Sequence, residues 1–221
     1  MDVLSQSEID ALLNALSSGE VKIEELKENQ KQADHKRYDF RRPNKYSKEQ
    51  LRTMQMLHGV FARLLSSFLT GYLRNNIQFE VASVDQLTYE DFIRSTPSPT
   101  VLTVFSLNPL SGTAILQLDP LFLFPMIDLY FGGNGEPPKS VRELTDIELS
   151  VARKLSMKIL ENLAMAWKDI VQVEPVIESI ETNPYLHQIF SFNEIVALIT
   201  LTTQVGEHSR GFINLCLPFP L

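Results

Sequence analysis

The first apolar stripe in the chain lies near its N-terminus and has helical spacing. Ser5 and Glu8 form a capping box, in which each side chain accepts the backbone N–H of the other residue, and this pattern is typical of a helix start. The apolar residues that follow recur at i, i+3, i+4 and i+7, and they are Ile9, Leu12, Leu13 and Leu16. The pattern predicts an amphipathic helix within residues 1–19, ended by Ser17-Ser18-Gly19.

Residues 20–45 separate this stripe from the rest of the chain. They are rich in charge and poor in large apolar side chains, so they predict a flexible linker without a core of its own. An isolated helix of about twelve residues is only marginally stable in water. We therefore expect the first helix to be mostly unfolded until a partner accepts its stripe. Alternatively, the stripe docks on the chain's own domain.

Residues 46–221 carry the patterns of one packed domain. Two long helices are predicted, each begun by a capping box, at Ser47-Lys48-Glu49-Gln50 and at Thr145-Asp146-Ile147-Glu148, and the second runs to about Trp167. Each helix is followed by three segments rich in β-branched and aromatic residues, which are typical of strands. These predicted strands are residues 78–88, 100–107 and 112–118 in the first half, and 171–181, 194–202 and 211–217 in the second.

The two halves therefore read as repeats, at about residues 46–131 and 144–221. In the first repeat, we expect the strands 100–107 and 112–118 to form a hairpin, with the strand 78–88 nearby. The sequence predicts an α/β fold in which two helix-plus-three-strand repeats share one sheet and the long helices pack on it.

A short helix is predicted at the end of the first repeat. Asp119-Pro120 is typical of an N-cap followed by the first helical residue, and the helix should reach Phe131, with Pro125 kinking it. Leu217-Pro218 occupies the corresponding place in the second repeat.

A glycine-rich stretch, Gly132-Gly133-Asn134-Gly135, follows this helix and precedes Pro137-Pro138. The glycines allow backbone conformations closed to other residues, and the prolines prevent a return to helix, so a shaped loop is expected. Phosphate binding is not expected, because phosphate-binding loops need Gly-Lys-Ser/Thr opening a helix or a strand before the glycines. Two interpretations stay open: a surface loop that a partner approaches closely, and a structural hinge between the repeats.

Composition narrows the function classes. A net charge of −7 argues against general attraction to nucleic acid, although Arg37, Arg41, Arg42 and Lys45 form a short basic cluster. The single cysteine, Cys216, lies in an apolar run and excludes an internal disulfide, which suits a reducing cytoplasm.

The four histidines have no metal-ligand spacing, and we expect no cofactor. No signal peptide is visible, and prolines interrupt the longest uncharged stretch, residues 95–118.

Three motifs, in this order along the chain, resemble the flagellar motor switch FliM family. They are Leu4-Ser5-Gln6-Ser7-Glu8-Ile9-Asp10-Ala11-Leu12-Leu13, Tyr38-Asp39-Phe40-Arg41-Arg42-Pro43 and Gly132-Gly133-Asn134-Gly135. The resemblance implies a pseudo-twofold middle domain like that of the CheC/CheX phosphatases. The family's FliN-like C-terminal domain is missing, and the apolar end Pro220-Leu221 also suggests that a domain is absent.

The resemblance also implies a function. The chain would be a rotor component in the flagellar C-ring, cytoplasmic and peripheral to the inner membrane, in contact with neighbouring copies and with FliN through the missing domain. The loop is implied to bind FliG through Phe131, Gly132, Gly133, Asn134 and Gly135. The N-terminal helix is implied to bind phosphorylated CheY through Leu4, Ser5, Gln6, Glu8, Ile9, Asp10, Leu12, Leu13 and Leu16. No nucleic acid and no small-molecule substrate are expected.

The alternative function is a CheC/CheX-type phosphatase acting on the aspartyl phosphate of a response regulator. The phosphatases that this chain resembles act through a helical Asp/Ser-x3-Glu-x2-Asn pattern. Its acid and its amide position a water molecule against the aspartyl phosphate. Neither predicted long helix has this pattern, because Glu49 is followed three positions later by Arg52, Glu148 by Val151 and Glu161 by Ala164. The sequence therefore favours a binding protein over an enzyme.

Overall fold

The computed structural model describes residues 45–185, 189–207 and 209–219. These residues belong to one compact unit that begins at Asn44. The helix predicted within residues 1–19, and the linker predicted after it up to residue 44, lie outside the described residues.

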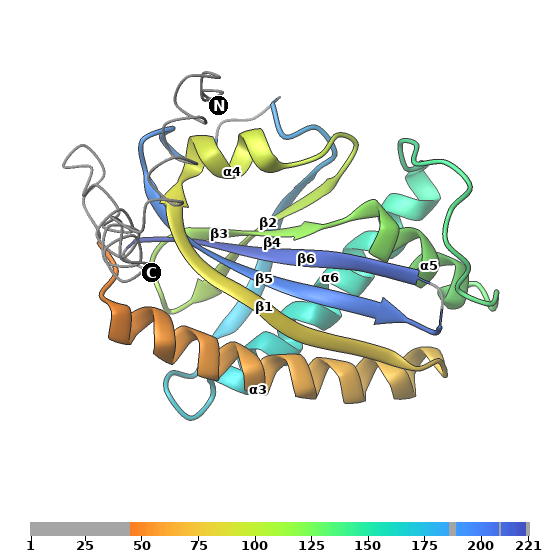
Figure 1. Cartoon of the computed structure of the whole chain (residues 1–221), viewed down its shortest axis with the longest axis horizontal. Helices are drawn as coiled ribbons and strands as arrows, with labels where there is room; N and C mark the ends of the chain where they lie inside the picture. The colour runs from red at the N-terminus through yellow and green to blue at the C-terminus, as the bar shows by residue number, and fades with distance from the viewer. Residues whose placement is uncertain (1–44, 186–188, 208, 220–221) are drawn as a thin grey trace, which may run out of the picture. The chain divides into compact units, whose positions relative to one another are not determined.

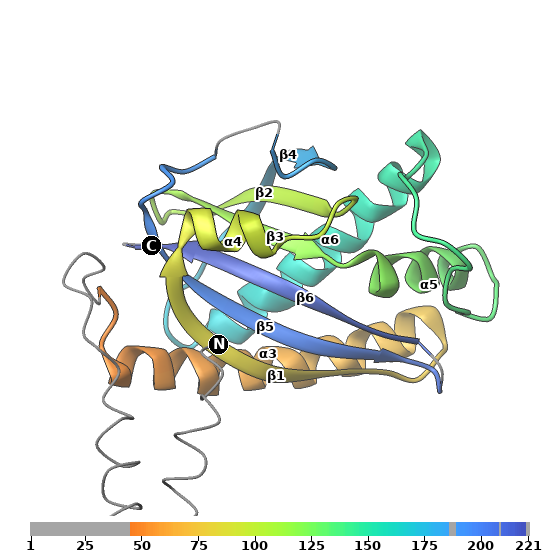
Figure 2. The ribbon, with the colours of Figure 1, turned by 45° about the horizontal axis from the view of Figure 1, so that its top comes forward.

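One six-stranded sheet forms the centre of the described part, with the strand order β1-β5-β6-β3-β2-β4 (Figures 1 and 2). All neighbouring strands are antiparallel. The strands are β1 (Ile77–Thr88), β2 (Val101–Asn108), β3 (Thr113–Leu118), β4 (Glu174–Glu181), β5 (Ile195–Val205) and β6 (Ser209–Pro218).

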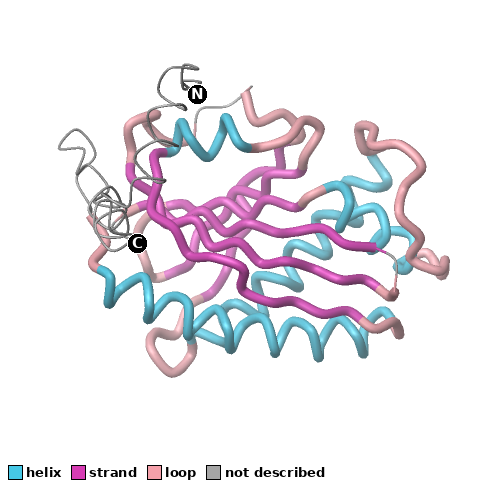
Figure 3. Tube along the Cα trace, in the orientation of Figure 1, coloured by secondary structure: helices cyan, strands magenta, loops and turns pink. Residues whose placement is uncertain are grey.

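Three helices share the main core with one face of this sheet: α3 (Lys48–Leu73), α5 (Pro120–Tyr130) and α6 (Asp146–Trp167). Both predicted capping boxes are present, since Ser47 caps α3 together with Gln50, and Thr145 caps α6 together with Glu148. Figure 3 shows one long helix, α3, lying along β1, and the other, α6, running obliquely to the strands. The expected fold class, one sheet with the long helices packed on it, is confirmed.

The two repeats exchange their outer strands. The β2–β3 hairpin is confirmed, but the expectation that the strand 78–88 lies beside it is wrong, because β1 pairs with β5 at the opposite edge. Correspondingly, β4 of the second repeat pairs with β2 of the first. Each repeat therefore completes the sheet of the other, and the pairing of β3 with β6 joins the two halves at the centre.

Hydroxyl groups on α3 cover the outer edge of β1. The backbone N–H of Phe79 donates to the hydroxyl of Ser66 at 2.9 Å, and the N–H of Ile77 donates to the hydroxyl of Thr70 at 3.1 Å. Because unpaired N–H groups of an edge strand invite pairing with another chain, these bonds close that edge along part of its length.

A fourth helix, α4 (Tyr89–Ser95), was missed by the sequence analysis. It packs on the other face of the sheet and buries Tyr89, Phe92 and Ile93 in a second, smaller core (Figure 2). Its cap was readable, because Thr88 accepts the N–H of Asp91, three residues later. Cys216 lies buried in this core, and burial raises the pKa of its thiol, which disfavours the reactive thiolate.

Candidate functional site

The glycine loop begins at the C-terminal end of α5. The N–H of Gly132 donates to the carbonyl of Leu129 at 3.0 Å, and the N–H of Gly133 donates to the carbonyl of Asp128 at 2.8 Å. This pair of bonds is the Schellman ending of a helix, which needs a left-handed residue after the cap. Gly132 is that residue, with φ of 89°. The predicted helix stop at Gly132 is therefore confirmed, and its glycine has a conformational reason.

Asp128 and Ser209 hold the far end of the loop. The carboxylate of Asp128 accepts the N–H of Gly135 at 2.9 Å, and the hydroxyl of Ser209 in β6 donates to the carbonyl of Gly135 at 3.1 Å. Gly135 is buried and has φ of 74°. The loop is thus fixed at both ends, and it exposes the residues between these two anchors.

The structure brings the predicted FliG-binding residues together, and all but one of them face solvent. The side chain of Phe131 is 61% exposed, and Gly132, Gly133 and Asn134 are also exposed, whereas Gly135 is buried. The glycines need no partner to explain them, because Gly132 and Gly135 have positive φ and a side chain on Gly133 would overlap Asp128. The predicted CheY-binding residues lie outside the described residues.

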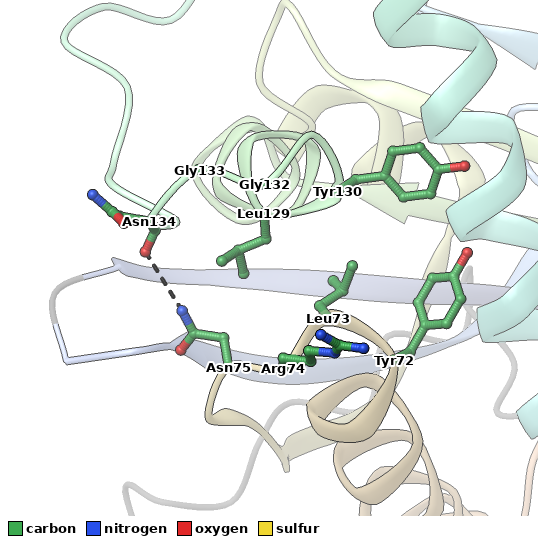
Figure 4. A pocket seen from close by; sticks show the side chains of 9 residues that line it. All are labelled: Tyr72, Leu73, Arg74, Asn75, Leu129, Tyr130, Gly132, Gly133 and Asn134. Atoms are coloured by element: carbon green, nitrogen blue, oxygen red, sulfur yellow. Dashed lines mark hydrogen bonds between the residues drawn. The ribbon is translucent and has the colours of Figure 1, made fainter.

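A hollow of about 600 Å³ separates the loop from the turn between α3 and β1 (Figure 4). The amide nitrogen of Asn75 reaches across it and donates to the carbonyl of Asn134 at 3.5 Å. Arg74 ends α3 in the left-handed conformation, with φ of 54°. The sequence analysis missed this half of the site, although Arg74-Asn75-Asn76 directly after a long helix is a readable turn signal.

A second hollow, of about 520 Å³, lies on the other side of the α5 terminus. Phe124, Ile127, Asp128 and Phe131 form one stripe of α5 along this hollow, whereas Leu129 and Tyr130, on the opposite side of the helix, line the first hollow. The loop therefore stands between two depressions of the surface.

Arg142 fixes the chain that returns from the loop to α6. Its guanidinium makes two hydrogen bonds with the carboxylate of Glu148, at 2.7 and 2.8 Å, and lies 5.1 Å from the ring centroid of Phe124. The hydrogen bond from Arg142 is the main reason why the pKa of Glu148 is lowered to about 2. The pair is neutral as a unit and contributes little net charge to the second hollow.

The arrangement is suited to binding a protein. An exposed aromatic side chain on a preorganised loop between two hollows is typical of an interface anchor. Within residues 45–185, 189–207 and 209–219, no group of three or more His, Cys, Asp or Glu side chains could hold a metal ion. In the same ranges, no helix has the length and apolar content that crossing a lipid bilayer requires.

Comparison with known proteins identifies the family. The family model of flagellar motor switch protein FliM matches residues 47–221. FliM of Treponema pallidum is 47% identical over 99% of this chain and 63% of its own length. FliM of Bacillus subtilis is 43% identical over 98% of this chain and 65% of its own length. The chain thus spans slightly less than two thirds of the length of these curated relatives.

Solved structures agree with this match. A chain in the FliG–FliM complex of H. pylori is 39% identical, with a TM-score of 0.75 over 78% of this chain and 94% of that chain. The FliM middle domain of H. pylori is 37% identical, with a TM-score of 0.72 over the same shares. FliY of Thermotoga maritima shares the fold, with a TM-score of 0.71 at 16% identity. The chain belongs to the flagellar motor switch protein FliM family.

Proposed function

We propose that this chain is a rotor component of the bacterial flagellar motor switch and that its glycine loop, residues 131–135, binds FliG. The observation that carries the proposal is the similarity to a chain solved in a FliG–FliM complex, at 39% identity. The exposed loop is the surface that fits such a contact, since Phe131 is 61% exposed on a loop held by hydrogen bonds at both ends. A loop that is already ordered loses little conformational entropy on binding.

Titration calorimetry of FliG with the chain and its Phe131→Ala variant tests this contact. Loss of an aromatic anchor from the centre of an interface should raise Kd by about tenfold or more. Tyr185→Ala is the matched control, because Tyr185 is 66% exposed and lies outside the loop and both hollows. Equal affinities of the two variants, with unchanged melting temperatures, would contradict binding through this loop.

The N-terminal helix is proposed to bind phosphorylated CheY. Residues 1–20 include Asp2, Glu8, Asp10 and Glu20 but no lysine or arginine, so the acceptor surface should be basic. Burying four apolar side chains at about 1.5–3 kcal/mol each, against about 2–5 kcal/mol for ordering the segment, leaves modest affinity, roughly micromolar. Such weak binding permits rapid exchange of the regulator.

A pair of acidic substitutions separates the stripe from general charge effects. Ile9→Asp places a charge on the apolar stripe and should abolish CheY binding, whereas Asn14→Asp adds the same charge off the stripe and should change it little. Fluorescence anisotropy with phosphorylated CheY measures both. In cells, Ile9→Asp should abolish switching of rotation while rotors still assemble, and unaffected switching would refute the role of the helix.

The proposal also locates the chain in the cytoplasm, at the inner-membrane face of the flagellar basal body. Neighbouring copies would meet along the exposed edges of α3 and α6, where Val60 and Met165 are 39% and 62% exposed, and FliN would be bound through a further domain. Cysteines introduced at Val60 and Met165 should cross-link adjacent copies in assembled rotors. Absence of cross-linking from every pairing of α3 and α6 positions would count against this arrangement.

A further inference from the structure

The two hollows beside the glycine loop differ in charge. Arg74 lines the hollow next to the α3–β1 turn, together with Tyr72 and Asn75. Asp128 and Glu136 line the hollow on the other side of the loop. Glu148 also lines the second hollow, but its ion pair with Arg142 neutralises it. A partner that straddles the loop therefore meets a cationic surface on one side and an anionic surface on the other.

The cationic side offers donors that the chain itself does not use. Arg74 is exposed, and within the described ranges its guanidinium forms no ion pair or hydrogen bond with another side chain. Figure 4 shows the side chain of Arg74 between Asn75 and Tyr72, with Leu129 on the opposite side of the hollow. A second cation lies near another residue of this hollow, since the ammonium of Lys154 is 5.9 Å from the ring centroid of Tyr130. The exposed guanidinium of Arg74 favours a carboxylate as its partner.

The anionic side combines acids with an apolar wall. Phe124, Ile127, Phe131 and Pro138 supply carbon surface, and Asp128 and Glu136 supply negative charge beside it. The carboxylate of Asp128 already accepts the N–H of Gly135, so Glu136, which is exposed, is the acid most available to a partner. This combination fits an apolar side chain with a lysine or arginine near it.

We propose that the FliG segment that binds this loop straddles it in one fixed orientation, with an acidic side chain against Arg74 and a basic side chain, next to an apolar one, in the hollow beside Phe131. This inference rests on the proposed function of the loop. Complementary charges on the two sides fix the register of the segment, because reversing it would place like charges together.

Charge reversal on each side tests the orientation with the full chain and FliG in titration calorimetry. Arg74→Glu and Glu136→Lys should each raise Kd by about five- to twentyfold at low salt, and the effect should shrink in about 0.5 M salt, where charges are screened. Arg74→Lys keeps the charge and should bind nearly as the natural chain does. Melting temperatures report whether each variant folds, and Arg74→Gln replaces Arg74→Glu if that variant unfolds.

The controls are equal charge reversals outside the hollows. Arg63 lies on the exposed side of α3, and Glu178 lies on the edge strand β4. Arg63→Glu and Glu178→Lys should each change Kd by less than about twofold. If Phe131→Ala weakens binding but both reversals match these controls, the orientation is wrong while binding through the loop stands. An effect of only one reversal overturns the two-sided arrangement. If FliG does not bind, or Phe131→Ala has no effect, the proposed function itself fails.

Discussion

The carboxylate of Asp128 occupies the space into which a side chain on Gly133 would project. The same carboxylate accepts the N–H of Gly135 at 2.9 Å, so it cannot move aside without releasing the buried end of the loop. Asp128 and Gly133 are therefore coupled, and the shape of the exposed loop depends on both.

We expect Gly133→Ala to be destabilising, by about 1–2 kcal/mol, because the new methyl group displaces the Asp128 carboxylate. Asp128→Ala should cost about 1 kcal/mol through loss of its hydrogen bond. The double variant should cost clearly less than the sum, since removal of the carboxylate makes room for the methyl group. Urea unfolding of the four proteins measures the coupling, and strict additivity would show that the two residues do not interact.

Gly132→Ala should destabilise the domain by about 1–2 kcal/mol, because Gly132 has φ of 89°, a conformation that residues with a Cβ atom disfavour. No atom lies within 4 Å of the added methyl group, so the cost comes from the backbone conformation alone. Gly71→Ala is the control, since Gly71 lies within α3, also has no neighbour within 4 Å and has no positive φ. There the same substitution should stabilise by about 0.5–1 kcal/mol. In chemical denaturation, the two substitutions should change the free energy of unfolding in opposite directions. A loss of stability at both positions would contradict the conformational explanation for Gly132.

The ion pair between Arg142 and Glu148 should be visible in the titration of Glu148. Arg142→Gln should return the pKa of Glu148 from about 2 toward 4.5, because the hydrogen bond from Arg142 is the largest cause of its lowering. The stability that the pair contributes is present above pH 4.5 and lost as pH falls toward 2. Since Arg142 is solvent exposed, we expect the variant to lose little stability at neutral pH. Carboxyl NMR titration checks the pKa.

His58 should make the stability of the domain depend on pH in a second, higher range. It is fully buried between α3 and α6, 6.1 Å from the ring of Trp167, and burial lowers its pKa from 6.5 to about 4. The unfolded chain therefore binds more protons than the folded chain between these values. The stability contribution is full above pH 6.5 and falls as pH drops toward 4, by about 3 kcal/mol.

The variant His58→Asn isolates this effect, because the amide nitrogen of asparagine lies near the position of Nδ1 and can still donate to the carbonyl of Met54, which Nδ1 of His58 contacts at 2.8 Å, but asparagine does not titrate. The free energy of unfolding should fall less steeply in the variant than in the natural chain between pH 6.5 and 4. Asp119, whose pKa is raised by burial, acts in the opposite direction in both proteins, so it cancels in the difference. Parallel pH curves would exclude His58 as the source.

The sequence predicted those parts of the fold that depend on local signals. The capping boxes at Ser47 and Thr145 were readable because both partners of each bond lie within four residues. The helix stop at Gly132 was readable for the same reason, since a left-handed cap favours glycine. The short helix α4 was missed because its cap ends the strand β1, so one run of residues carries two successive patterns.

Features that join distant residues were not readable from the sequence. Nothing local in Ile77–Thr88 states that its partner is β5, about 120 residues later, instead of the neighbouring hairpin. The hydrogen bond between Asn75 and Asn134 spans 59 residues, so half of the candidate site came only from the structure. The loop residues themselves were found, because glycine permits backbone conformations that other residues avoid and proline fixes its own φ, wherever they occur.

The exchange of outer strands predicts that neither half of the domain folds alone. A break between Pro137 and Pro138, in the segment after the loop, separates the β2–β3 hairpin from β4 and β6, and the β5–β6 hairpin from β1 and β3. Each fragment then has unpaired strand edges and an uncovered apolar face. A single hairpin is at best marginally stable in water under these conditions. We expect fragments 1–137 and 138–221 to lack a cooperative thermal transition separately and to recover one when mixed in equal amounts. Circular dichroism and thermal melting measure both states. A cooperative transition in either fragment alone would show that the repeats are independent and that the exchange of strands is not needed for folding.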